Sequence, residues 1–284
     1  MTTSASAIAD KCRTFRQLHA QGCFVIPNPW DVGTARYLQH LGYKALATTS
    51  AGFAYAAGYA DDEVPLGPML AHIRELAAAT QVPVNADFGD GYADHPDGVG
   101  ENVRRCVEAG VAGLSIEDST GEKDAPLYDL EHAVARVRAA RTAIDATGGG
   151  VVLTARCESF LVGRPDLPEV LRRLQAYKTA GADCLYAPGI KTREQIAAVV
   201  QAAAPLPVNV LMSSAGGLTV SDLAALGVRR ISVGSALSRV AWQAFMRAAR
   251  EIAETGTFNA FADMATASEL NTFFHADAAA RLSR

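Results

Sequence analysis

Eight short apolar runs alternate with eight longer amphipathic segments along this chain of 284 residues. The short runs resemble buried parallel strands, and the segments between them place apolar residues at helical spacing. A strand–helix unit repeated eight times predicts an α/β fold, the (β/α)8 TIM barrel. The predicted strands are Cys23–Ile26, Ala45–Thr48, Val82–Asp87, Gly113–Glu117, Val151–Ala155, Cys184–Ala187, Val208–Leu211 and Arg230–Val233.

The segments between the strands end in a common pattern, in which a glycine and a short link lead into the next strand. "HLGYKAL", "EAGVAGL", "TAGADCL" and "ALGVRRI" all follow it, and glycine suits the left-handed backbone that often ends a helix. No G-x-G-x-x-G follows the first strand, which argues against a dinucleotide-binding sheet. The predicted helices are Thr34–Leu41, Leu66–Ala78, Val99–Ala109, Leu130–Ala146, Leu167–Ala180, Arg193–Ala203, Val220–Leu226 and Ser238–Glu254.

Two further segments lie outside the eight units. Residues 1–21 predict an N-terminal helix, and residues 256–284 predict a helical extension at the C-terminus. No change of composition marks a second domain, so we expect one barrel domain over residues 1–284.

Composition disfavours several classes of partner. The chain has 26 basic and 30 acidic residues and a net charge of −4, which gives no basic surface for nucleic acid. We find no signal peptide and no apolar run near the ~18 residues of a membrane span. The five cysteines form no C-x-x-C pair and indicate reduced thiols. We therefore expect a cytoplasmic protein without nucleic-acid or membrane partners.

Charged and polar side chains occupy the carboxyl ends of the predicted strands, where barrel enzymes place their active sites. Asp87 and Glu117 end neighbouring strands, Arg156 follows the next, and Asn209 lies on the seventh. Adjacent carboxylates repel unless a cation lies between them, and Mg²⁺ prefers oxygen ligands. Arg156 offers a planar fork for a substrate carboxylate. The pattern indicates Mg²⁺ and a small anionic substrate, although strand-end turns and an internal ion pair are the alternative for each residue.

Other chemistries find less support. None of the five lysines ends a predicted strand, the six histidines do not cluster, and there is no G-x-S-x-G motif. The stretches "SSAGGLT" (213–219) and "SVGSALS" (232–238) follow the last two strands. Phosphate often binds there in barrels, but ordinary turns explain the glycines equally well.

Several long stretches resemble the isocitrate lyase/phosphoenolpyruvate mutase superfamily. They are "NPWDVGTAR" (28–36), "ALATTSAGFAYAAGYAD" (45–61), "PVNADFGDGYAD" (83–94), "GVAGLSIEDS" (110–119), "TARCESF" (154–160) and "AGADCLYAPG" (180–189). The resemblance implies a barrel whose last helix is often exchanged between subunits of a homodimer or homotetramer. It also implies Mg²⁺-dependent chemistry, with Mn²⁺ as an alternative, on C–C or P–C bonds of 2-oxo or 2-hydroxy acids through an enolate-like intermediate.

The resemblance and the strand ends together define three sets of candidate residues. The metal set is Asp61, Asp87, Asp90 and Glu117. The substrate-binding set is Ser50, Ala51, Gly52, Arg156 and Asn209. The catalytic set is Glu117, Lys123 and Arg156.

Two departures from the family pattern bear on the chemistry. The second acidic residue of the strand-3 motif is replaced by Gly89, with Asp90 beside it as a substitute ligand. The loop "EDSTGEKDAPLYD" (117–129) lacks the acid/base cysteine of the isocitrate and methylisocitrate lyases. It also lacks the Lys-Thr-Asn of phosphonate-processing members, since Lys123 precedes an Asp and an Ala.

Three functions are consistent with these features. The first is an Mg²⁺-dependent lyase or decarboxylase of a small 2-oxo or 2-hydroxy dicarboxylic acid, acting through an enolate-like pyruvate intermediate. Departing CO₂ needs no acid, which suits a loop without Cys or His. The second is a P–C bond mutase or hydrolase acting on phosphonopyruvate, with Lys123 as its support. The third is a catalytically reduced barrel that binds a 2-oxo acid, with Gly89 as its support.

Overall fold

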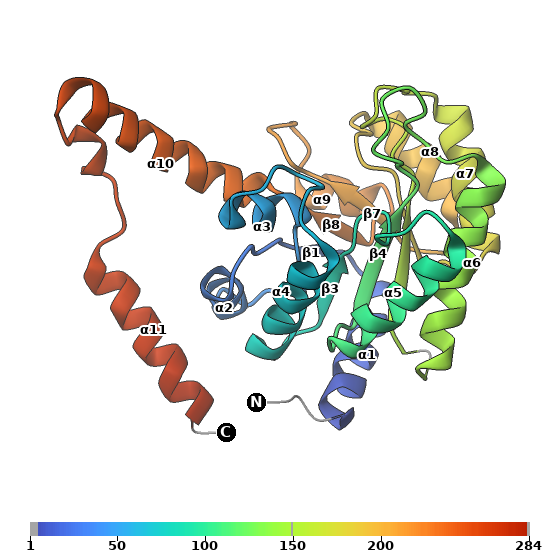
Figure 1. Ribbon diagram of the computed structural model, residues 1–284, viewed down its shortest axis with the longest axis horizontal. Helices are drawn as coiled ribbons and strands as arrows, with labels where there is room; N and C mark the ends of the chain where they lie inside the picture. Colours follow the sequence, from blue (N-terminus) through green and yellow to red (C-terminus); the bar gives the residue numbers. More distant parts are fainter. Residues whose placement is uncertain (1–4, 149, 283–284) are drawn as a thin grey trace.

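Eight parallel strands form the centre of the molecule in a computed structural model that describes residues 5–148 and 150–282 (Figure 1). The strand order is β1-β8-β7-β6-β5-β4-β3-β2. The amide of Ala47 donates to the carbonyl of Pro27 at 3.1 Å and closes the sheet, so the predicted (β/α)8 barrel is confirmed. The strands are β1 (Phe24–Ile26), β2 (Leu46–Ala47), β3 (Val84–Asp87), β4 (Gly113–Glu117), β5 (Val152–Arg156), β6 (Cys184–Tyr186), β7 (Val208–Leu211) and β8 (Arg230–Ser232).

Helices follow the strands and cover the outside of the barrel, and several begin at side-chain caps. Asp31 and Thr219, for example, form capping boxes at the starts of α2 and α9. The helices are α1 (Ala5–Ala20), α2 (Val32–His40), α3 (Ser50–Ala57), α4 (Leu66–Ala79), α5 (Pro96–Glu108), α6 (Leu130–Ala146), α7 (Leu167–Thr179), α8 (Arg193–Ala203), α9 (Val220–Ala225), α10 (Ala236–Thr255), the short 3-10 helix η1 (Asn259–Phe261) and α11 (Ala267–Leu282).

The main departure from the predicted elements is α3, which occupies a stretch in which no helix was predicted. Thr49 caps it by accepting a hydrogen bond from the amide of Gly52, and Gly58 ends it with a φ of 82°. Several strands are also shorter than predicted. β3 begins at Val84 because the preceding residue, Pro83, has no amide hydrogen to donate.

The N-terminal helix α1 packs across the amino ends of the strands. Phe15 is fully buried there, and a Cβ atom on Gly113 would lie 2.5 Å from its ring. The Nζ atom of Lys11 donates to the carbonyls of Ala77 and Thr80 at 2.8 and 2.7 Å. This end of the barrel is therefore covered, which leaves the carboxyl ends of the strands for a site.

The C-terminal helices leave the barrel as an arm (Figure 1). Ser238 is the buried residue of α10, whereas Val240 and Phe245 are 69% and 62% exposed. Helix α11 lies near α2, where Phe273 contacts the ring of Tyr37. Exchange of a helix between subunits involves a second chain and stays a prediction. No helix in the described part of the chain has the length and apolar character needed to cross a membrane.

Candidate active site

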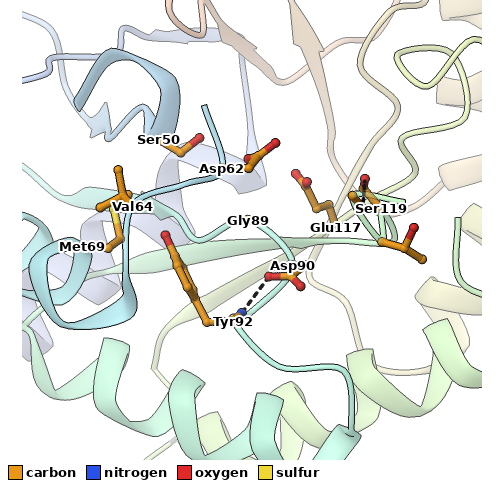
Figure 2. Close-up of a pocket in the computed structure, with 11 residues that line it drawn as sticks. Ser50, Asp62, Val64, Met69, Gly89, Asp90, Tyr92, Glu117 and Ser119 are labelled. Carbon is orange, nitrogen blue, oxygen red and sulfur yellow. Dashed lines mark hydrogen bonds between the residues drawn. The ribbon is translucent and has the colours of Figure 1, made fainter. Parts of the chain in front are cut away.

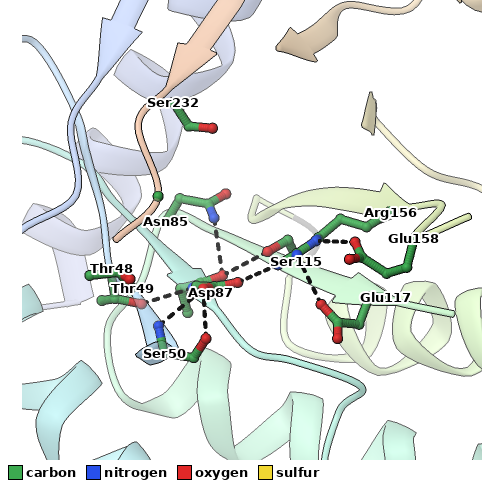
Figure 3. Close-up of polar contacts among 12 residues, drawn as sticks. Thr48, Thr49, Ser50, Asn85, Asp87, Ser115, Glu117, Arg156, Glu158 and Ser232 are labelled. Atoms are coloured by element: carbon green, nitrogen blue, oxygen red, sulfur yellow. Dashed lines mark hydrogen bonds and ion pairs between the residues drawn. The ribbon is translucent and has the colours of Figure 1, made fainter. Parts of the chain in front are cut away.

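Arg156 forms the centre of an ionic network at the carboxyl ends of β3, β4 and β5 (Figure 3). Its Nη1 atom lies 2.6 Å from Asp87, its Nη2 atom 3.0 Å from Glu117 and its Nε atom 2.9 Å from Glu158. Glu117 and Arg156 are paired in register on adjacent parallel strands. The predicted residues of these strand ends therefore meet, and we call Asp87, Glu117 and Glu158 the rim carboxylates.

Ser50 joins this network through the unpredicted helix α3. Its amide and its Oγ atom both donate to the second carboxylate oxygen of Asp87, each at 3.0 Å. The amide of Asp87 donates in turn to Thr48 at 2.8 Å. The first turn of α3, with Ala51 and Gly52, thus directs the positive end of a helix toward the rim.

Asp90 lies in the turn that follows β3. Its carboxylate accepts a hydrogen bond from the amide of Tyr92 at 2.8 Å (Figure 2). The same carboxylate lies 4.0 Å from Arg136. Arg136 also donates to the backbone carbonyl of Asp90. A Cβ atom on Gly89 would meet nothing within 4 Å. The place of the missing second acid is therefore open, and the carboxylate of Asp90 is engaged by its own turn.

Two small cavities adjoin the network and share Ser50. The rim cavity, of about 180 Å³, lies beneath the loop after β4. The lumen cavity, of about 150 Å³, extends into the barrel. The rim cavity is lined by Ser50, Asp62, Val64, Met69, Gly89, Asp90, Tyr92, Glu117, Ser119, Thr120 and Gly121. Lining residues of the lumen cavity include Ser50, Ala51, Asp61, Asn85, Asp87, Arg156, Tyr186, Asn209, Arg230 and Ser232.

Two carboxylates that line the cavities, Glu117 and Asp61, carry raised pKa values. Burial raises the pKa of Glu117 well above its usual range, and Glu158 and Asp87 act in the same direction. The pKa of Asp61 rises to about 6 through partial desolvation and repulsion from Asp62 and Asp87, although much of its surface is exposed. Burial is the largest cause of both shifts and neighbouring carboxylates add to it, and three carboxylates contact the single guanidinium of Arg156.

The crowding of carboxylates is relevant to the Mg²⁺ ion that the sequence resemblance implies. Within residues 5–148 and 150–282, no three His, Cys, Asp or Glu side chains form a ready-made metal site. The chemistry of the donor set nevertheless suits a hard cation, since Asp61, Asp87 and Glu117 supply oxygen atoms whose mutual repulsion a cation relieves. The residues present therefore fit Mg²⁺ by their chemistry.

Lys123 and Asn209 lie in very different surroundings. Lys123 is exposed in the loop after β4, a loop closed by a bridge between Ser119 and Leu127. Asn209 is fully buried in the barrel, where it accepts a hydrogen bond from Arg230 at 2.9 Å. Asn209, which was predicted to bind substrate, thus lines the lumen cavity.

Sequence reasoning did not select Asp62, Glu158, Tyr186 or Arg230, all of which belong to the network or line a cavity. Glu158 lies two residues after Arg156, close enough in sequence to have been considered. The ring of Tyr186 lies 5.2 Å from the guanidinium of Arg156. Arg230 begins β8, and sequence alone did not indicate that its side chain lies inside the barrel.

Arg230 and its neighbours form the bottom of the lumen cavity, which we call the floor. Its Nη1 atom lies 3.4 Å from Asn85 and 3.3 Å from Nε2 of His19 on α1. Nδ1 of His19 is hydrogen-bonded to the carbonyl of Phe15 at 2.8 Å. Burial and the nearby Arg230 lower the pKa of His19 to about 3, so its imidazole is neutral.

The sequence pattern of the family described as phosphoenolpyruvate phosphomutase matches residues 15–253. The chain belongs to this family. A Mycobacterium tuberculosis relative of uncharacterised function is 33% identical over 243 residues, covering 85% of this chain and 89% of the relative. An oxaloacetate decarboxylase of Pseudomonas putida is 32% identical over 238 residues, or 78% of each chain.

Solved structures of phosphoenolpyruvate phosphomutase/isocitrate lyase superfamily members share the barrel. A Burkholderia cenocepacia protein, provisionally assigned as a lyase or mutase, superposes with a TM-score of 0.91 at 48% identity. That match covers 95% of this chain and 98% of the other. A 2,3-dimethylmalate lyase matches with a TM-score of 0.83 at 27% identity, covering 100% and 98% of the two chains. The names of two of these relatives thus specify a substrate, oxaloacetate in one and 2,3-dimethylmalate in the other.

Proposed function

We propose that this protein is a cytoplasmic, Mg²⁺-dependent lyase or decarboxylase that cleaves a C–C bond in a small 2-oxo or 2-hydroxy dicarboxylic acid. One observation carries the proposal: Arg156 and the carboxylates of Asp87 and Glu117 meet beside cavities that admit only a small molecule. The similarity to an oxaloacetate decarboxylase and a 2,3-dimethylmalate lyase supports the substrate class. The five free cysteines support a reducing compartment.

The chain's own residues have distinct tasks in this proposal. Asp87 and Glu117, with Asp61 nearby, would hold the cation, which acts as a Lewis acid toward a developing enolate oxygen. Arg156 binds a substrate carboxylate through its fork, and the amides at the start of α3 orient that group.

The loop after β4 favours decarboxylation over acid-assisted cleavage. Residues 117–129 carry neither Cys nor His, and Tyr128 is engaged with the carboxylate of Asp94 at 2.6 Å. Departing CO₂ itself needs no proton, and the pyruvate enolate left behind can take its proton at C3 from water, so this loop need not supply an acid. P–C chemistry on phosphonopyruvate is the alternative, and it depends on Lys123 reaching the site from its exposed position.

The test is release of the 2-oxo acid product (glyoxylate from isocitrate, pyruvate from the others), with and without Mg²⁺ or Mn²⁺, from oxaloacetate, methylisocitrate, isocitrate, alkylmalates and phosphonopyruvate, with phosphoenolpyruvate also measured for the last. We expect metal-dependent release from a dicarboxylic acid and its loss in Asp87→Ala. Asp97→Ala is the matched control, because it removes the same charge from an exposed position in the first turn of α5. Release from phosphonopyruvate alone would favour the P–C reaction. Absence of turnover, with a 2-oxo acid still bound, would favour the catalytically reduced barrel.

We further propose that the protein is a homodimer or homotetramer whose second copy covers the arm. The exposed apolar residues of α10 and the following segment support it, among them Trp242, Phe245 and Phe258. Light scattering after size exclusion should give a dimer or tetramer, and Phe245→Ser together with Phe258→Ser should shift it toward monomer. A wild-type monomer would exclude the assembly.

A further inference from the structure

Arg230 is a buried cation at the floor of the lumen cavity, and 3% of its surface is exposed. It lies in register with Asn209 on β7, and its Nε atom donates to that side chain at 2.9 Å. Its other contacts are the amide oxygen of Asn85 and the imidazole of His19. Throughout the described chain, no carboxylate pairs with Arg230, and its Nη2 atom has no hydrogen-bond partner.

The neutral surroundings leave the charge of Arg230 uncompensated. His19 cannot neutralise it, because Nδ1 donates to Phe15 and the imidazole presents a lone pair to the guanidinium. Asn85 and Asn209 contribute only amide dipoles. A buried cation without a partner is costly unless an anion approaches it. A ligand can approach Arg230 through the cavity that it lines.

We propose that Arg230 binds the second acid group of a two-acid ligand, whose first acid group lies at the rim near Arg156. This inference rests on the proposed function and extends it by naming a residue that selects dicarboxylic over monocarboxylic acids. Arg156 and Arg230 line the same cavity of about 150 Å³, so one small ligand in it can face both guanidinium groups.

The lumen cavity extends from the rim to the floor. Ser50 and Arg156 line it at the rim, and Arg230 lines it at the floor. A diacid placed between them satisfies the Nη2 atom of Arg230 and offsets the buried charge. A monoacid leaves that charge unpaired, so the floor discriminates against it.

The test measures binding without turnover, by calorimetry with succinate as the diacid and butyrate as the monoacid, in the presence of Mg²⁺. Wild-type protein should bind succinate at least about tenfold more tightly, the effect of one charge-assisted contact. In Arg230→Gln, the two acids should bind with affinities within about twofold, with butyrate affinity unchanged. Equal affinities in wild type, or a preference that persists in Arg230→Gln, would overturn the inference.

Asn209→Asp tests the same idea without removing the buried arginine. It replaces the side-chain amide of Asn209, whose oxygen lies 2.9 Å from Nε of Arg230, with a carboxylate of the same shape. The floor then contains a protein anion that pairs with Arg230. We expect a higher thermal midpoint and loss of the succinate preference; a retained preference would contradict the inference. Arg239→Gln, on the exposed surface of α10, controls for the change in net charge and should keep the preference.

These outcomes separate the inference from the proposed reaction. If no acid is turned over but the succinate preference exists and disappears in both floor variants, the floor inference stands and the reaction falls. If oxaloacetate is decarboxylated while the preference persists in the variants, the floor inference falls and the reaction stands.

Discussion

Two arginines line one small cavity in opposite surroundings. At the rim, Arg156 contacts three carboxylates. At the floor, Arg230 contacts two asparagine side chains and a neutral histidine. The rim therefore carries excess negative charge and the floor carries positive charge without a protein partner. This difference teaches that burial alone does not define an arginine's role, since a ligand must share Arg156 with three protein carboxylates but meets no protein carboxylate at Arg230.

The barrel architecture accounts for this polarity. The parallel strands bring acidic residues from distant parts of the sequence to their shared carboxyl ends, as Asp87 and Glu117 show. The amino ends are covered by α1, which contributes Phe15 and His19. A cation bound at the rim and an acid bound at the floor thus meet complementary charges.

The largest effect on stability should come from removing the guanidinium of Arg156 at the rim. Arg156→Gln leaves Asp87, Glu117 and Glu158 without their shared partner, and we expect a loss of about 3–5 kcal/mol in the free energy of unfolding. Arg230→Gln should cost less, because it leaves neutral groups behind. Urea unfolding at pH 7.5 measures both variants. If Arg230→Gln lowered the free energy of unfolding as much as Arg156→Gln or more, the proposed difference between the rim and the floor would be wrong.

Lowering the pH should reduce the stability of the folded protein through His19, which lies at the floor. Its folded-state pKa of about 3 lies below the usual value of 6.5, so the unfolded chain binds a proton first as the pH falls. The stability due to neutral His19 is therefore present above pH 6.5 and is lost as the pH falls from there toward 3. Between pH 7.5 and 5, wild type should lose about 2 kcal/mol more than His19→Gln. Parallel stability curves for the two proteins in urea titrations would show that His19 is not held neutral.

The sequence predicted the rim better than the floor, for physical reasons. Asp87, Glu117 and Arg156 end apolar runs, and every such end of a parallel barrel faces the same way. The contact of Ser50 with Asp87 depends on α3, a short helix whose Ala- and Gly-rich sequence has no clear apolar face. The position of Arg230 inside the barrel depends on strand register, which a three-residue strand does not specify.

An acidic residue at position 89 should add negative charge to the rim and strengthen the binding of a metal ion there. Gly89 has a φ of 51° and open space beside it, and Asp tolerates this backbone region better than most residues. We expect Gly89→Asp to bind Mn²⁺ about tenfold more tightly than Gly89→Ala, which carries the backbone cost without the carboxylate. Titration of Mn²⁺ by electron paramagnetic resonance gives the affinities. Equal affinities would mean that a carboxylate at position 89 does not reach the cation.

The smallest effect should come from Lys123, which lies above the rim and belongs to neither region. An exposed ammonium gains little from distant charges in water. If C–C cleavage relies on the rim and the floor alone, Lys123→Ala should change kcat for a dicarboxylic acid by less than about twofold. Steady-state kinetics with oxaloacetate and phosphonopyruvate, beside Lys44→Ala as a control, measure this. A large loss of kcat confined to Lys123→Ala would mean that the loop brings this lysine to the substrate. The active site would then extend beyond the two arginines to include a third cation.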